Sequence, residues 1–152
     1  DLLDADCELD LNDSSWKIFT EDVTTLPHYV SADAVVKNAY ITQGCTIKGE
    51  VTGSVLFTNA KVGKDAKVID TVLMPGAVVE DGAVVTRALI ADGVKIGKGA
   101  VVKNCILMQD TVVEAGANLD YVITDKNVTV EVAQELHGTD SFPVYVAKGQ
   151  TV

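Results

Sequence analysis

The chain has 152 residues and a mass of 16.1 kDa, the size of one domain or of one domain with an appendage. Its net charge is −10 and Arg87 is its only arginine, so nucleic acid and anionic membrane surfaces are poor partners. Hydrophobic residues make up 47% of the chain, and 25 of its residues are valine. Because valine is stiff at χ1 and favours strands, this composition excludes a helical bundle.

Residues 1–29 differ in pattern from the rest of the chain and are expected to form a linker and N-terminal cap. Their sequence pattern predicts a short helix around Leu2–Asp13, a strand-like stretch over Trp16–Thr20 and a connector through Pro27. This segment would cover the unpaired strand edge at one end of a β-rich fold. No basic segment precedes a hydrophobic one and no apolar run could span a bilayer, so neither a secretory leader nor a membrane segment is expected.

An internal repeat organises residues 30–130. Six segments superpose, and their matching aliphatic residues are spaced by 15, 17, 17, 17 and 16 positions. These residues are Ile41, Leu56, Leu73, Ile90, Leu107 and Ile123. A period near 17 is too short for ankyrin or tetratricopeptide units.

Each repeat contains a motif of six residues, called a hexad below. An aliphatic residue is followed four positions later by a small residue and six positions later by the next aliphatic one, as in Leu73, Ala77 and Val79. The third cycle of each repeat has five residues, as from Val85 to Ile90. Three short sides per turn describe a triangular prism with inward aliphatic residues and with glycine, asparagine and aspartate at tight corners. The predicted fold is all-β, a parallel β-helix of about six turns and roughly 30 Å in length.

Residues 131–152 are predicted to form a C-terminal cap. Glu131–Leu136 is expected to make one helical turn, and residues 146–152 repeat the hexad once more and would close the last turn.

No catalytic, cofactor-binding or metal-binding residue is assigned from the sequence. Hexapeptide acyltransferases use a histidine general base, usually on a coil or loop at a trimer interface. His28 lies just before the first turn and His137 just after the last, so neither is within the stack, and both are interpreted as solvated loop histidines. Two histidines cannot supply the three-histidine zinc site of carbonic anhydrases built on such a prism. The free cysteines Cys7, Cys45 and Cys105 show no pairing pattern, which suits a reducing cytoplasm.

Six lysines recur at corners or outward positions. They are interpreted mainly as solubilising, with a shallow anion-binding surface as the alternative. These lysines are Lys61, Lys64, Lys67, Lys95, Lys98 and Lys103.

Several segments together resemble the C-terminal domain of glucose-1-phosphate adenylyltransferase (ADP-glucose pyrophosphorylase). These segments cover residues 1–4, 16–20, 27–29, 49–57 and 106–110. Residues 121–127 and 143–149 are closest to the GlgD-type subunit of glycogen synthesis. The resemblance covers essentially the whole chain. Similarity to hexapeptide-repeat proteins also implies that the β-helix is left-handed.

The resemblance implies a non-catalytic role for this chain alone. The family's reaction converts ATP and glucose 1-phosphate into ADP-glucose and pyrophosphate with Mg²⁺, in a larger N-terminal nucleotidyltransferase domain that this chain lacks. The β-helix would instead serve allosteric regulation and the assembly of a homo- or hetero-oligomer with a catalytic adenylyltransferase subunit, in the cytoplasm and without a cofactor of its own. No effector-binding residue can be carried over.

Two alternatives remain open at this point. One is a trimeric hexapeptide acyltransferase that binds acyl-CoA near His28 or His137, and the other is the β-helix tail of another sugar-nucleotide pyrophosphorylase. The assembly surface is predicted on the side that bears Tyr40, Phe57, Met74 and Met108, because these residues are expected to follow inward positions and to point outward.

Overall fold

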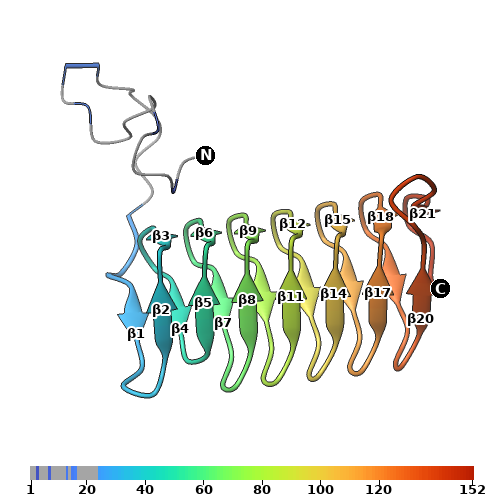
Figure 1. Ribbon diagram of the computed structural model, residues 1–152, viewed down its shortest axis with the longest axis horizontal. Coiled ribbons are helices and arrows are strands. Elements are labelled where there is room, and N and C mark those ends of the chain that lie inside the picture. Colours follow the sequence, from blue (N-terminus) through green and yellow to red (C-terminus); the bar gives the residue numbers. More distant parts are fainter. Residues whose placement is uncertain (1–2, 4–6, 8–12, 14, 17–23) are drawn as a thin grey trace.

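The computed structural model describes residues 3, 7, 13, 15–16 and 24–152. The predicted helix over Leu2–Asp13 and the stretch Trp16–Thr20 fall almost entirely outside these residues, so both remain predictions. From Tyr29 onward, 21 short strands wind into a triangular prism (Figure 1). The described part of the chain contains no helix, and therefore none that is long and apolar enough to cross a bilayer.

The prism has three faces, each a parallel sheet of seven strands. Face A consists of β1 (Tyr29–Val30), β4 (Thr46–Ile47), β7 (Lys61–Val62), β10 (Val78–Val79), β13 (Lys95–Ile96), β16 (Val112–Val113) and β19 (Thr129–Val130). Face B consists of β2 (Val35–Lys37), β5 (Glu50–Thr52), β8 (Lys67–Ile69), β11 (Val84–Thr86), β14 (Val101–Lys103), β17 (Asn118–Asp120) and β20 (Glu135–His137). Face C consists of β3 (Tyr40–Ile41), β6 (Val55–Leu56), β9 (Val72–Leu73), β12 (Leu89–Ile90), β15 (Ile106–Leu107), β18 (Val122–Thr124) and β21 (Val144–Val146).

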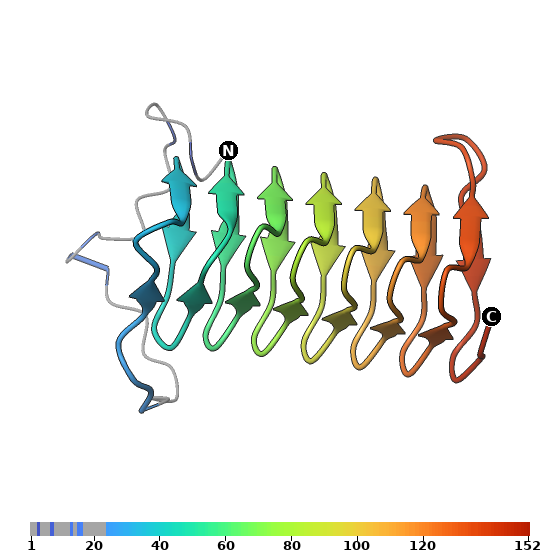
Figure 2. The same ribbon diagram turned by 90° about the horizontal axis from the view of Figure 1, so that it is seen from below.

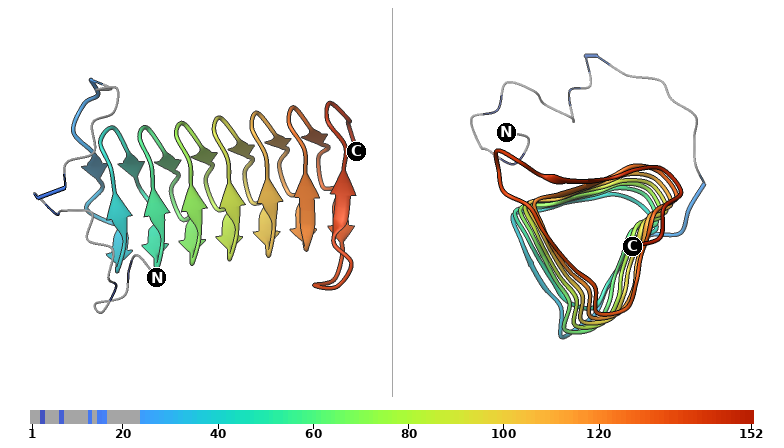
Figure 3. Two further views of the ribbon diagram at one scale, coloured as in Figure 1. Left: turned by 90° about the horizontal axis from the view of Figure 1, so that it is seen from above. Right: turned by 90° about the vertical axis from the view of Figure 1, so that its right-hand side faces the viewer.

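Each strand pairs with the strand one full turn earlier and one full turn later, so a turn of chain, or coil, visits faces A, B and C in order. Seven strands per face leave six turns between the first strand and the last. Figure 2 shows the coils stacked along one axis, and the view along that axis in Figure 3 shows them as one triangle. The parallel β-helix predicted from the hexads is thereby confirmed, in agreement with the left-handed winding that the resemblance to hexapeptide-repeat proteins implied.

The core is a column of aliphatic side chains inside the triangle. In the fourth coil, Val79, Val85 and Ile90 point inward from the three faces and are at most 1% exposed. Fully burying such a side chain stabilises the fold by about 1.5–3 kcal/mol, and the parallel register repeats this burial in each interior coil. The hexads therefore specify both the core and the strand register.

One repeat assignment is wrong. The register on face C pairs Leu107 with Thr124 and not with Ile123, which pairs with Ile106 and lies on the outer side. Thr124 is completely buried, and its hydroxyl lies 3.0 Å from that of the equally buried Thr111. Threonine has nearly the shape of valine, so it fits the aliphatic column once its hydroxyl has a partner.

The helical turn predicted over Glu131–Leu136 is also wrong. Residues 131–134 form another corner and β20 follows directly, so Leu136 takes the inward position six residues after Val130. Gln134 stands where the hexad normally places a small residue, which concealed the motif. The sheets thus continue past residue 130 to β21.

The last coil carries an insertion and a closing strand. Residues 138–143 form a loop in which Thr139 and Phe142 pair, and this loop leaves the triangular outline at one corner (Figure 3). Thr151 then pairs in parallel with Thr129, and the amide of Glu131 donates to the carbonyl of Val152 at 2.7 Å. The tail therefore adds an eighth strand position at face A, as the repeated hexad predicted.

Candidate functional site

The outer sides of the three faces differ in chemistry. On face A, the outward residues include Lys61 and Lys95. On face B they include Glu50 and Lys67. On face C, the outward residue just before each inward one is uncharged in all seven coils. We call this set the outer column: Tyr40, Val55, Val72, Leu89, Ile106, Ile123 and Tyr145.

The outer column is accessible to solvent over the whole length of the prism. Leu89 and Ile106 are each 41% exposed in the middle coils, and Tyr145 is 63% exposed in the last. Monomeric proteins seldom expose a contiguous apolar patch of more than a few hundred Å², and larger patches mark interaction surfaces. Face C is therefore the candidate interface of this domain.

A second line of residues, the corner column, follows the inward residues of face C. It contains one charged residue, Asp125, and the hydroxyl of Tyr145 donates to that carboxylate at 3.4 Å. The corner column consists of Thr42, Phe57, Met74, Ala91, Met108, Asp125 and Ala147. Together the two columns make face C the largely apolar side of the prism.

The sequence analysis predicted face C as the assembly surface, but it named only some of the residues that line this face. Phe57, Met74 and Met108 do follow inward residues, and Phe57 is 37% exposed. Tyr40 instead precedes the inward Ile41 and belongs to the outer column. The rest of the outer column was missed, although an apolar residue directly before each inward aliphatic was a visible signal.

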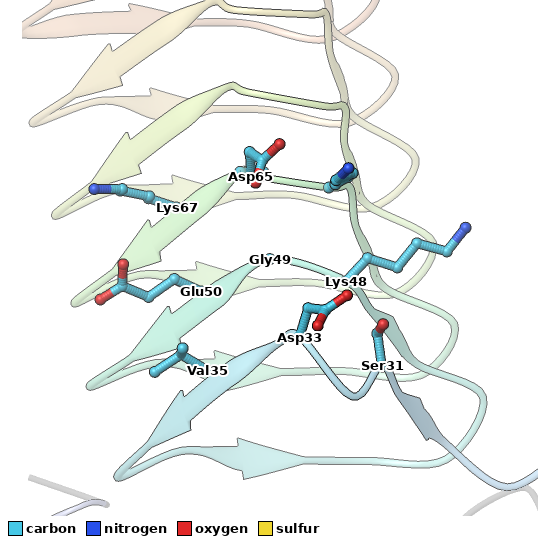
Figure 4. Close-up of a pocket in the computed structure, with 10 residues that line it drawn as sticks. Ser31, Asp33, Val35, Lys48, Gly49, Glu50, Asp65 and Lys67 are labelled. Carbon is cyan, nitrogen blue, oxygen red and sulfur yellow. The ribbon is translucent and has the colours of Figure 1, made fainter.

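A notch lies where faces A and B meet near the N-terminal end of the prism (Figure 4). Six of the seven corners between these faces hold four residues, whereas residues 48–49 make the second corner with only two. The missing pair leaves a hollow of about 310 Å³. It also explains the 15-residue spacing near the start of the repeat. Gly49 is essential there because a Cβ atom would lie 2.3 Å from the carbonyl oxygen of Ala66.

The notch has a balanced charge. Its lysines are matched in number by carboxylates, so it offers neither a phosphate site nor a cation site of clear sign. Its charged side chains are Lys48, Lys64, Lys67, Asp33, Glu50 and Asp65. Among the residues that the structure describes, no group of three or more His, Cys, Asp and Glu side chains could hold a metal ion.

The lysines singled out by the sequence do not form one anion-binding surface. Lys61 and Lys95 lie on face A, Lys67 and Lys103 on face B, and Lys64 and Lys98 at the corners between them. A second shallow hollow of about 300 Å³ on face A brings together Lys48, Lys61 and Lys98, but Glu80 and Asp81 line it as well.

The two histidines lie at opposite ends of the prism. His28 is exposed just before β1. His137 ends β20, so it lies within the stack and not after it as the sequence suggested. Its Nε2 is 3.9 Å from the carboxylate of Glu135 on the outer side of face B. Neither histidine lines the notch or the second hollow.

Cys45 and Cys105 are buried in the core. Burial raises the pKa of both thiols, that of Cys105 to about 11. The Cys105 thiol donates to the carbonyl of Lys103 at 2.9 Å. A nucleophilic cysteine needs a lowered pKa and access to solvent, so these two act as small hydrophobic residues.

The geometry is that of a hexapeptide-repeat domain, and comparison with known proteins identifies its family. The profile of the GlmU-like C-terminal hexapeptide domain matches residues 26–102 and 81–141. The chain belongs to the GlmU-like C-terminal hexapeptide family.

Among curated proteins, the chain is similar to glucose-1-phosphate adenylyltransferases. It is 39% identical over 90 residues to those of Bacillus mycoides strain KBAB4 and Bacillus anthracis. The match covers 59% of this chain and 24% of each relative, so the chain spans about a quarter of the length of the relatives it matches.

Two solved structures show the same fold. The acetyltransferase domain of PglB from Neisseria gonorrhoeae FA1090 superposes with a TM-score of 0.60 and 29% identity, over 63% of this chain and 50% of that one. A hexapeptide transferase family protein from Anaplasma phagocytophilum superposes with a TM-score of 0.52 and 20% identity, over 84% of this chain and 77% of that one.

Proposed function

We propose that this chain is the β-helix domain of a glucose-1-phosphate adenylyltransferase subunit of the GlgD type. In this role it serves assembly and allosteric regulation in glycogen synthesis and does not itself convert ATP and glucose 1-phosphate. The observation that carries the proposal is the 39% identity to such enzymes over a stretch that represents only 24% of their length. The chemistry of the whole enzyme, with its Mg²⁺, would then belong to the remaining portion.

The surface of the prism supports an assembly role. Face C offers a long apolar side, while the charged side chains in the described part of the chain lie on the other faces and at the corners, Asp125 among them. Buried free thiols suit a reducing cytoplasm, where such a subunit would work. The assembly would be a homo- or hetero-oligomer that includes a catalytic adenylyltransferase subunit or domain.

The first test is light scattering after size exclusion, with and without a full-length catalytic adenylyltransferase from the same source. We expect a mixed complex whose mass exceeds that of either protein alone. Separate elution at all mixing ratios would contradict the assembly role.

A parallel assay measures ADP-glucose formation from ATP, glucose 1-phosphate and Mg²⁺. The chain alone should give no product above the blank, and it should change the effector response of the catalytic subunit when the two are mixed. Turnover by the isolated chain would contradict its non-catalytic assignment.

Acyl transfer is the second candidate, favoured by the likeness to the PglB acetyltransferase domain. It would require a histidine near an interface between prisms, and His137 on face B is better placed for this than His28. Protection by acetyl-CoA in a thermal-shift assay, lost in His137→Ala, would favour this function. No shift at saturating acetyl-CoA would count against it.

A further inference from the structure

We infer that face C binds a second copy of this chain, with the two prisms side by side and parallel, so that each coil meets the same coil of its partner. This inference deepens the assembly part of the proposed function and names a partner for that surface. It comes from the chemistry of the face, from its size pattern and from its area.

Charge restricts which faces of two copies can meet. With a net charge of −10, two copies repel each other wherever their charged sides approach. The outer column is the outward line of seven stacked positions without a charged residue, and the corner column beside it has one, Asp125. Two copies therefore meet at least electrostatic cost when face C meets face C, and the apolar side chains there gain from removal of water.

The sizes of the side chains select the orientation. A two-fold axis parallel to the prism places the outer column of one copy against the corner column of the other, coil by coil. Large residues then oppose small ones: Tyr40 meets Thr42, Leu89 meets Ala91, and Tyr145 meets Ala147 of the second copy. In the other coils, Val55 meets Phe57, Val72 meets Met74 and Ile106 meets Met108, while Ile123 meets Asp125, whose carboxylate accepts a hydrogen bond from the Tyr145 hydroxyl of its own chain.

An antiparallel arrangement lacks this complementarity. It would place the outer columns against each other and the corner columns against each other. Tyr40 would then oppose Tyr145, whereas Ala91 would oppose only the second Ala91. Protein interfaces pack as densely as protein interiors. An antiparallel dimer, with large residues crowded together in some coils and gaps in others, is therefore disfavoured.

The area of the face sets the expected strength. Six steps of about 4.8 Å give a length of roughly 30 Å, and a side of about five residues gives a width of roughly 15–20 Å. Such a patch buries about 900–1,200 Å² in total, which is at the lower end for specific association. The dimer should therefore be weak and populated at micromolar concentrations or above.

The first experiment is light scattering of the chain alone over a concentration series from micromolar to millimolar. We expect a reversible monomer–dimer equilibrium. Leu89→Glu should weaken it at least tenfold, because it adds two carboxylates without hydrogen-bond donors to the middle coil of the interface. The matched control is Val84→Glu, which places the same charge on face B of the same coil. Circular dichroism and thermal unfolding establish that both variants remain folded.

The second experiment tests the orientation with a short bismaleimide cross-linker in a Cys7→Ser background. In the parallel dimer, Tyr40→Cys cross-links to itself and Tyr145→Cys cross-links to itself. Products that form only when the two variants are mixed would indicate an antiparallel dimer and overturn the inference.

Three further outcomes would overturn it: a monomer at all concentrations, a trimer, or a dimer that Leu89→Glu and Val84→Glu affect equally. None of these results depends on the catalytic adenylyltransferase, which is absent from both experiments. Failure here is thus distinguishable from failure of the mixed complex.

Discussion

Thr111 and Thr124 form a polar pair inside an otherwise aliphatic stack. Their hydroxyls lie 3.0 Å apart with both residues fully buried, and the Thr111 hydroxyl also reaches the carbonyl of Asp125 at 3.3 Å. Valine occupies the equivalent place beside each, at Val128 and Val146, so valine would fit both sites. What distinguishes the two threonines from valine at these sites is therefore the hydrogen bond between their hydroxyls, because the shape of the side chain is nearly the same.

Replacing one member should cost more than replacing both. Thr111→Val alone removes the only side-chain partner of the buried Thr124 hydroxyl and should lower the free energy of unfolding by about 1–2 kcal/mol. The double variant Thr111→Val/Thr124→Val should come within about 0.5 kcal/mol of the native protein. Urea unfolding of the four proteins measures the coupling. Strictly additive losses would mean that the two hydroxyls do not interact.

The Cys105 thiol should make stability depend on alkaline pH. Its pKa rises from 9.0 in the unfolded chain to about 11 in the fold, because burial disfavours the thiolate. A group with a raised pKa contributes its stabilisation fully below pH 9, and that contribution is lost as the pH rises toward 11. Cys105→Ala, which copies Ala88 one coil earlier, should show a shallower fall in unfolding midpoint over this range. Parallel pH profiles for the two proteins would contradict the assignment.

At the scale of elements, the corners decide where the coils depart from regularity. Apart from residues 31–34, corners of four residues use a positive φ at their third position, as at Gly82, Gly99 and Gly116. The two-residue corner at 48–49 has no such position, and Gly49 is required there by close approach and not by its φ. The same residue type therefore serves two different physical needs.

These two needs predict different costs of adding a methyl group. Gly82 has open space around its missing side chain, so Gly82→Ala should cost only the left-handed backbone strain, about 1 kcal/mol. Gly49→Ala forces the backbone of the neighbouring coil to move and should cost about 3 kcal/mol. Thermal and urea midpoints measure both. Equal costs would contradict the role of the tight corner in shaping the notch.

Much of the element layout was predictable because the hexad links sequence directly to register. The aliphatic column of Leu56, Leu73, Ile90 and Leu107 was assigned correctly from spacing alone. Ile123 was assigned wrongly because adjacent β-branched residues, Ile123 and Thr124, both fit a strand, and only the buried partner Thr111 favours the second. The outer column could not be ranked above the other faces until the register placed its members side by side.

At the scale of the whole molecule, each coil contacts only the coils before and after it. Stability in such a stack is roughly a sum of coil terms and nearest-neighbour terms. A destabilising substitution in a middle coil therefore separates the folded coils on its two sides. The same substitution in an end coil unfolds only that terminal coil.

Ile90→Asp should accordingly be far more harmful than Ile41→Asp. Ile90 is fully buried in the fourth of seven strands on face C, so a carboxylate there should cost more than about 4 kcal/mol and broaden unfolding into two steps. Ile41 is only half-buried in the first coil, where loss of the local strand can relieve the charge. Circular dichroism during thermal unfolding, together with amide hydrogen exchange measured separately for each coil, distinguishes the two variants. A single sharp transition for Ile90→Asp would mean that the prism unfolds as one unit.

The number of coils also fixes where matching residues stand on face C. Every coil adds one step of the stack, so the prism acts as a ruler that separates Tyr40 from Tyr145 by six steps. Deleting residues 84–100 would remove one whole coil and leave the remaining register intact, yet it would bring these two tyrosines one step closer. Such a shortened prism could fold normally and still fail to match a full-length copy at both ends. In the inferred dimer, the length of the prism would then restrict pairing to copies with the same number of coils.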